Sequence, residues 1–302
     1  MLGVAQANGR WIVQTLILIA VAGLAAQLVD GSLGMGYGLT SSTLLIFAGL
    51  TPAMASASVH LAEVGTTALS GIAHHQFGNV DWHVVRRIAI PGGIGAFFGA
   101  TLLSSLSTEA ARPLASTLLF LLGIYVLLRF LLGKARVQRH GRPGVKFLIP
   151  LGVLGGFIDA TGGGGWGPVT TPTLLADGRL APNRVIGTVG ASEFVVALSA
   201  SVGFFASLGG EGVKIEFVLA LLVGGLIAAP IAAYMVRHLN PRLLGVIVGG
   251  FICFTNARVI MAAMEISGEL FLAIYIAIVL IWTSSIAYVV LSMRRSPQGS
   301  IK

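Results

Sequence analysis

Apolar residues run along this chain in stretches about as long as a membrane-spanning helix, and few charged residues interrupt them. Eight of these stretches approach or exceed the roughly 20 residues that cross a bilayer as an α-helix. They are residues 11–28, 53–73, 84–106, 114–132, 185–208, 215–234, 243–264 and 270–293. Residues 39–50, 147–158 and 168–176 are too short to cross alone. The pattern predicts an all-α polytopic membrane protein that also contains half-helices.

The composition supports this assignment. Hydrophobic residues make up 55% of the chain and charged residues only 10%, whereas a typical soluble domain carries about 25% charge. The stretch 11–28 lacks the charged start and small-residue cleavage site of a removable signal peptide, so we retain it as structure.

Two apolar stretches contain an aspartate that is followed at once by glycine-rich chain, Asp30 before residues 31–38 and Asp159 before residues 160–167. Other residues recur at about the same spacing of 130. The pairs are Tyr37 with Trp166, Gly38 with Gly167, Pro52 with Pro182, and Glu63 with Glu193. The protein is therefore built from two repeats, and helices broken at matching places in two membrane repeats indicate a transport site.

The positive charge is unevenly distributed. The net charge is +8, and 15 of the 19 Lys and Arg residues fall in loops that we place in the cytoplasm. The opposite set of loops holds only Arg10, Arg112 and Lys214. This is the positive-inside bias of a membrane protein, and it does not indicate a nucleic-acid partner.

The same bias predicts the topology. The N-terminus lies outside, each short broken pair leaves on the side that it entered, and the two repeats are inverted. We divide the chain into a first repeat (1–132), a basic cytoplasmic linker (133–146), a second repeat (147–264), and an extra C-terminal helix with a cytoplasmic tail (265–302). Whether the short segments are re-entrant or cross a thin membrane stays open.

Four of the 11 acidic residues lie in apolar segments: Asp30, Glu63, Asp159 and Glu193. A carboxylate at mid-membrane depth costs about 2.5–3.5 kcal/mol even on lenient scales, so two matched pairs suggest a function in proton coupling. The aspartates could instead cap the amides of the adjoining breaks. His60 lies one turn before Glu63, and it is either a structural histidine or part of the same coupling group.

The residues around the breaks suit an anion, because amides at helix starts carry positive dipole ends and glycines permit a close approach. The candidate substrate-binding residues are Gly34, Gly36, Tyr37, Gly38, Thr40, Ser41, Gly163, Gly165, Trp166, Gly167 and Thr170. The aromatic pair could wall a pocket or pack between helices. Arg258, a further candidate, either binds substrate from inside the bundle or snorkels toward the outer face.

The motifs resemble those of the TauE/SafE family of sulfite exporters and sulfonate permeases. The resemblance rests on QLVDGSLGMGYGL at 27–39, TPA at 51–53, SVHLAE at 58–63, GNVDW at 78–82, and GGGGWGP at 162–168. It covers about residues 25–264. The resemblance implies a transporter of small anions such as sulfite, sulfoacetate or sulfonates in a bacterial-type inner membrane, and it fixes neither the substrate nor the direction.

We therefore predict a non-enzymatic anion transporter that works by alternating access, with no cofactor and no bound metal. Its expected partners are the small anion and the lipid bilayer, and a homodimer stays open. Two alternatives remain, an anion channel on the same scaffold and an intramembrane enzyme in which Asp30 and Asp159 form a carboxylate pair.

Overall fold

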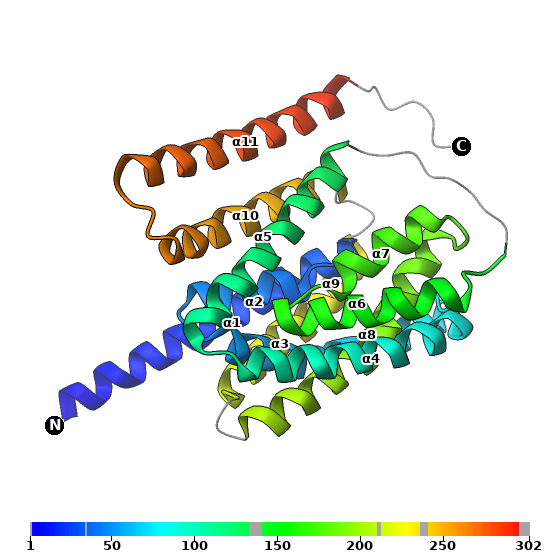
Figure 1. Cartoon of the computed structure of the whole chain (residues 1–302), viewed down its shortest axis with the longest axis horizontal. Helices are drawn as coiled ribbons and strands as arrows, with labels where there is room; N and C mark the ends of the chain where they lie inside the picture. The colour runs from blue at the N-terminus through cyan, green and yellow to red at the C-terminus, as the bar shows by residue number, and fades with distance from the viewer. Residues whose placement is uncertain (1, 34, 133–140, 210–212, 236–240, 296–302) are drawn as a thin grey trace.

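The computed structural model describes residues 2–33, 35–132, 141–209, 213–235 and 241–295, and all regular structure in these ranges is α-helical (Figure 1). The helices are α1 (Leu2–Leu33), α2 (Tyr37–Phe47), α3 (Pro52–Gln76), α4 (Trp82–Ser105), α5 (Thr108–Leu132), α6 (Val145–Gly162), α7 (Trp166–Asp177), α8 (Pro182–Leu208), α9 (Ile215–Met235), α10 (Pro241–Ala263) and α11 (Gly268–Arg295). The all-α prediction is confirmed for the described residues. Residues 133–140 of the predicted linker lie outside them.

Seven of the described helices are long and apolar enough to cross a membrane: α1, α4, α5, α6, α8, α10 and α11. The prediction was wrong for α6, which we expected to be too short over residues 147–158. This helix has 18 residues because it begins at Val145 and because Asp159 and the residues up to Gly162 stay helical. It ends only where Gly163 adopts a left-handed conformation, with φ of 78°.

Two predicted spans form helices that do not meet this apolar criterion. The described apolar stretch of α9, Ile215–Ala229, is short, whereas α3 has 25 residues and is too polar. The polar residues of α3 point into the protein: Ser56, Ser58, His60, Glu63, Thr66 and Thr67 are all buried. Its polarity therefore marks α3 as an interior helix.

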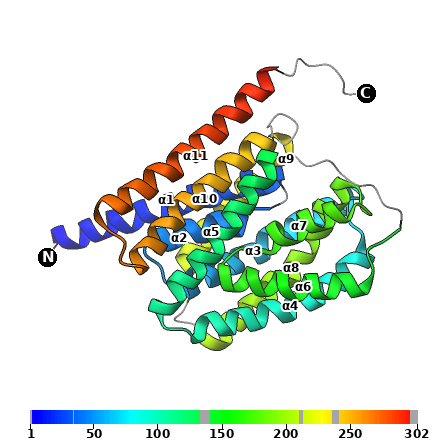
Figure 2. The ribbon, with the colours of Figure 1, turned by 45° about the horizontal axis from the view of Figure 1, so that its top comes forward.

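Helices from the two predicted repeats interleave in the structure. Helix α4 packs on α6 and α8, α1 packs on α9, and α5 packs on α10. Figure 2 shows α4, α6, α7 and α8 gathered on one side of α3, away from α10 and α11. Glycines allow these close contacts: a Cβ on Gly95 of α4 would lie 2.1 Å from the Val153 carbonyl oxygen, and one on Gly224 of α9 would lie 2.0 Å from that of Ala20.

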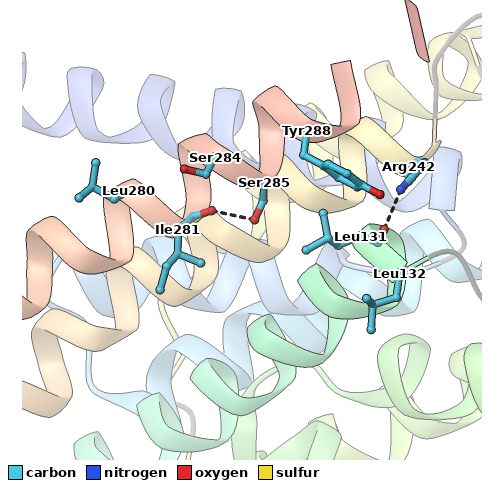
Figure 3. A pocket seen from close by; sticks show the side chains of 8 residues that line it. All are labelled: Leu131, Leu132, Arg242, Leu280, Ile281, Ser284, Ser285 and Tyr288. Atoms are coloured by element: carbon cyan, nitrogen blue, oxygen red, sulfur yellow. Dashed lines mark hydrogen bonds between the residues drawn. The ribbon is translucent and has the colours of Figure 1, made fainter. Parts of the chain in front are cut away.

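Helix α11 lies at the edge of the protein and packs on α10, and only 6% of its apolar stretch is buried (Figure 1). A groove of about 630 Å³ opens between α5, α10 and α11 (Figure 3). In this groove the Arg242 guanidinium donates hydrogen bonds to the carbonyls of Phe130 and Leu131 and lies over the Tyr288 ring. Arg242 thus holds the start of α10 against the end of α5.

Three loop regions that we place in the cytoplasm meet around Asp81. Its carboxylate accepts hydrogen bonds from the amides of His83 and Val84, which caps α4. Arg142 donates to it at 3.0 Å, and Arg184 lies 3.9 Å away. Burial alone would raise the pKa of Asp81, but the Val84 amide and Arg142 outweigh burial and hold the pKa below its ordinary value.

Candidate functional site

The chain breaks at the same place in both predicted repeats. Helix α1 is described to Leu33 and α2 begins at Tyr37, and α6 ends at Gly162 before α7 begins at Trp166. The short helices begin at Tyr37 and Trp166, two residues earlier than predicted. The candidate Gly34 lies outside the described residues. Both Asp-glycine segments therefore lie where one helix ends and a short helix begins.

The two breaks touch each other through glycines. A Cβ on Gly38 would lie 2.6 Å from the Gly164 Cα, and a Cβ on Gly164 would lie 2.1 Å from the Leu39 amide nitrogen. The Ser42 hydroxyl donates a hydrogen bond to the Gly163 carbonyl at the same place. Gly36, Gly163 and Gly164 also have positive φ angles of 127°, 78° and 150°. Only residues without a side chain fit this crossing.

The amides at the start of α7 are occupied in this structure, as in the capping role that we considered for the aspartates. Asp159 Oδ1 accepts hydrogen bonds from the amides of Gly165 and Trp166, at 2.6 Å and 2.8 Å. Asp159 stays in α6 and reaches across the break, since α6 continues further than expected. A buried carboxylate therefore occupies the positive end of α7 in this conformation.

The first repeat shows the same arrangement in part. The Asp30 carboxylate accepts a hydrogen bond from the amide of Tyr37, the first residue of α2. Asp30 is partly buried, whereas Asp159 is fully buried. Both aspartates thus cap the short helix that follows them, which is one of the two roles that we considered for them.

A buried polar cluster lies beside the second break. His60 Nε2 of α3 is 3.0 Å from Asp159 Oδ2, and His60 Nδ1 is 2.7 Å from the Ser56 carbonyl oxygen. Glu63 completes the cluster. Each of the three ionisable residues has one atom that could ligate a metal, and these three atoms lie within 4.8 Å of one another. This spacing would admit a cation, but Asp159 Oδ1 already accepts amide hydrogens and Oδ2 is hydrogen-bonded to His60, so we assign the cluster no metal.

The four membrane carboxyl groups gather in one region. Glu63 interacts electrostatically with Asp159, Glu193 and Asp30. Glu63 is buried, and its Oε2 atom has no hydrogen-bond partner among the described residues. Glu193 of α8 is only partly buried. The four carboxyl groups that the sequence paired between the repeats therefore lie near one another, although the two glutamates differ in exposure.

The aromatic candidates pack between helices. The Trp166 indole is fully buried, and its Nε1 donates to the Val189 carbonyl at 3.2 Å. The Tyr37 hydroxyl donates to the Leu221 carbonyl at 3.1 Å. A Cβ on Gly92 would lie 2.6 Å from the Trp166 ring, so this glycine makes room for the indole. We considered that Tyr37 and Trp166 either line a pocket or pack between helices, and their contacts are those of packing.

The hydroxyl candidates differ between the repeats. Thr40 Oγ1 and Ser41 Oγ of α2 are buried and have no hydrogen-bond partner among the described residues. The Thr170 hydroxyl of α7 donates to the Trp166 carbonyl of the preceding turn. Gly167 is buried in that same turn. Donors that remain unused in this conformation therefore lie in α2.

Arg258 does not join the other candidates. Its side chain is exposed, and its guanidinium lies 5.6 Å from the centre of the Phe47 ring. Phe47 is the last residue of α2, at the opposite end from the break. The outward position agrees with snorkelling rather than with binding from the bundle interior.

Two serines that we did not select contact the breaks directly. Ser56 donates to the Ala160 carbonyl at 2.8 Å, and Ser42 donates to that of Gly163. The spacing of Ser56 four residues before His60 could have indicated a shared helix face. Ser42 was hidden in the polar run 40–43, whose orientation depends on where α2 begins.

Comparisons with known proteins agree with the resemblance in the motifs. Residues 19–259 match the family described as Sulfite exporter TauE/SafE. The chain is 53% identical over 276 residues to the "Probable membrane transporter protein YtnM" of Bacillus subtilis (strain 168), covering 91% of this chain and 92% of that protein. It is 26% identical over 218 residues to the "Probable membrane transporter protein YdhB" of the same organism, covering 71% and 86%. No solved structure gives a significant match.

Proposed function

We propose a transport function for this multi-pass membrane protein, which belongs to the Sulfite exporter TauE/SafE family. Its substrate is a small sulfur-containing or other organic anion, such as sulfite, sulfoacetate or a sulfonate, and transport follows alternating access. The observation that carries this proposal is the contact between the two helix breaks at Gly38 and Gly164. Broken helices meeting at the interface of two repeats are the usual substrate site of such transporters.

The proposed substrate site lies at the starts of α2 and α7. The glycines of the breaks allow backbone contact, and the two helix dipoles favour a negative charge. The Thr40 and Ser41 hydroxyls supply donors that no described residue uses. Asp30, Asp159, His60, Glu63 and Glu193 form the proposed coupling group. Arg258 is proposed only as a secondary contact because its side chain points outward.

The helix packing supports an inverted repeat. If α1–α5 correspond to α6–α10, the pair α4 and α6 corresponds to the pair α9 and α1, and both pairs pack closely. The self-corresponding pairs α3 with α8 and α5 with α10 also pack. The meeting of Asp81, Arg142 and Arg184 brings together loops that the charge bias assigns to the cytoplasm. We propose that the N-terminus lies outside and the C-terminus inside.

Cysteine labelling tests this topology. In a Cys253→Ser background, a cysteine at Gln76 should react only from the cytoplasm, and cysteines at Ser207 and Ser267 only from outside. All three native side chains are exposed. Gln76 and Ser207 end corresponding helices, α3 and α8, so parallel repeats would place them on one side. Labelling of both from the same face would contradict the inverted arrangement.

A flux assay tests the transport function. Proteoliposomes that contain the protein should take up radiolabelled sulfite or an alkyl sulfonate, and a pH gradient should drive accumulation above equilibrium. A channel would dissipate an anion gradient without building one, so uptake that stops at equilibrium under every gradient would favour the channel. Empty liposomes provide the control. If none of the tested anions enters faster than in empty liposomes, the proposed function is wrong.

A further inference from the structure

We propose that Asp159 and the transported anion compete for the same backbone amides, and that a proton held by the His60–Asp159 pair must accompany the anion. Proton and anion would then move in the same direction. This inference rests on the proposed function and adds its coupling ion. It follows from the contacts of two buried side chains rather than from the family.

The competition follows from the α7 cap. Asp159 Oδ1 accepts hydrogen bonds from the amides of Gly165 and Trp166, at 2.6 Å and 2.8 Å. These are the amides that an oxyanion at the start of α7 would need, and they lie at the positive end of the helix dipole. An ionised Asp159 would both hold the donors and repel an incoming anion. The anion can bind there only when Asp159 yields the amides or loses its charge.

The hydrogen bonds of His60 show that the pair holds a proton. His60 Nδ1 faces the Ser56 carbonyl oxygen at 2.7 Å and the Ser56 hydroxyl oxygen at 3.2 Å. The hydroxyl donates its one hydrogen to the Ala160 carbonyl, and a carbonyl only accepts, so Nδ1 carries a hydrogen. His60 Nε2 faces Asp159 Oδ2 at 3.0 Å, and this contact also needs one hydrogen between the two atoms. Either His60 is an imidazolium beside a carboxylate, or a neutral His60 accepts from a protonated Asp159. The pair is neutral overall in both cases.

Loss of that proton changes what Asp159 can do. A neutral imidazole whose Nδ1 carries the hydrogen presents a lone pair at Nε2, which repels the Asp159 carboxylate. The carboxylate then keeps its negative charge on the α7 amides. With the proton present, Asp159 can leave the amides as a neutral acid, or His60 can balance the charge of the anion. One proton is therefore required for each bound anion.

The groups around the His60–Asp159 pair suit a proton-binding site rather than a purely structural helix cap. The ionisable groups that interact with Asp159 are His60 and Glu63 from α3 and Glu193 from α8, and Asp30 from α1 interacts with both glutamates. Asp81 provides a contrast, because it caps α4 through two amides in the same way but places its other oxygen on Arg142, which is always charged. Of these two caps, the one at the start of α7 is paired with a histidine.

Binding measurements across pH test the proposal. The probe is a radiolabelled alkyl sulfonate such as methanesulfonate, whose charge is constant near neutral pH, and the sample is the purified full-length protein. Binding to the unmodified protein should weaken by about tenfold per pH unit above the titration of the pair, because one proton is taken up with each anion. In proteoliposomes, an inward sulfonate gradient should carry protons inward.

Asp159→Asn is the matched variant. Its amide oxygen can still accept from the α7 amides, and its nitrogen can donate to His60, so it imitates the proton-loaded pair. Binding by Asp159→Asn should vary less than about twofold per pH unit, and the sulfonate gradient should no longer move protons. The control Asp81→Asn should keep the pH dependence of the unmodified protein. If Asp159→Asn does not fold, His60→Gln removes the imidazole from the pair, and the pH dependence of its binding should differ from that of the unmodified protein.

The possible results separate the two proposals. A flat pH dependence in the unmodified protein, or an unchanged slope in Asp159→Asn, would overturn the coupling and leave anion transport intact. If the unmodified protein neither binds nor transports sulfonate or sulfite at any pH, the proposed function itself fails, and the coupling proposal fails with it.

Discussion

Gly38→Ala should slow transport by about tenfold or more. The added Cβ would lie 2.6 Å from the Gly164 Cα and 2.9 Å from Glu63 Oε1. Because the first of these neighbours is backbone, it cannot rotate away, so the two breaks must separate. Overpacking of this kind costs about 1–3 kcal/mol, and we expect at least about a tenfold loss of flux if that cost falls on the transport cycle. Radiolabelled flux and thermal stability in detergent measure the two effects.

Gly190→Ala is the matched control for this substitution. Gly190 is also a helical glycine at an internal contact, but its added Cβ would meet nothing closer than the Ser70 hydroxyl oxygen at 3.7 Å. This variant should keep its flux and its melting temperature. If Gly38→Ala transports as well as Gly190→Ala, the contact between the breaks has no part in transport.

The position of the breaks could be predicted from the sequence because it depends on local chemistry. Asp30 and Asp159 stand directly before glycine runs, and glycines in left-handed conformations end α6 at Gly163 and precede α2 at Gly36. Such signals act over a few residues. Their recurrence after about 130 residues also indicated that the two breaks are related.

The contacts that give the site its chemistry could not be predicted in this way. The bond between His60 and Asp159 joins residues 99 positions apart, and it depends on how α3 packs against the end of α6. Our prediction also ended α6 before Asp159, so this side chain was expected at the edge of a loop rather than folded over the start of α7. The amides at the start of α7 are occupied for that reason.

The exposure of residues that correspond between the repeats could not be predicted from the sequence either. Glu63 and Glu193 are paired by position, yet only Glu63 is fully buried. The interleaving of the repeats explains how this arises, since each glutamate faces helices that differ in sequence from those facing its counterpart. A repeat in sequence therefore predicts related places in the fold and leaves their environments undetermined.

This difference makes Glu63→Gln the most informative substitution of the coupling group. Glu63 lies beside the His60–Asp159 pair, and its Oε2 has no hydrogen-bond partner among the described residues. We infer that it passes the proton between the pair and the aqueous side. Glutamine keeps the shape and removes this step, so accumulation driven by a pH gradient should fall by about tenfold or more. Substrate exchange without a gradient should continue.

Glu193→Gln provides the comparison for Glu63→Gln, because it makes the same chemical change at the corresponding place in α8, where the side chain is less buried. Accumulation driven by a pH gradient should fall less in Glu193→Gln than in Glu63→Gln. Both variants should keep the pH dependence of sulfonate binding, since each retains His60 and Asp159, and this separates a relay from the proton-binding pair itself. Accumulation that is unchanged in both variants would return the two glutamates to a structural role, whereas loss of binding in Glu63→Gln would place Glu63 in the substrate site.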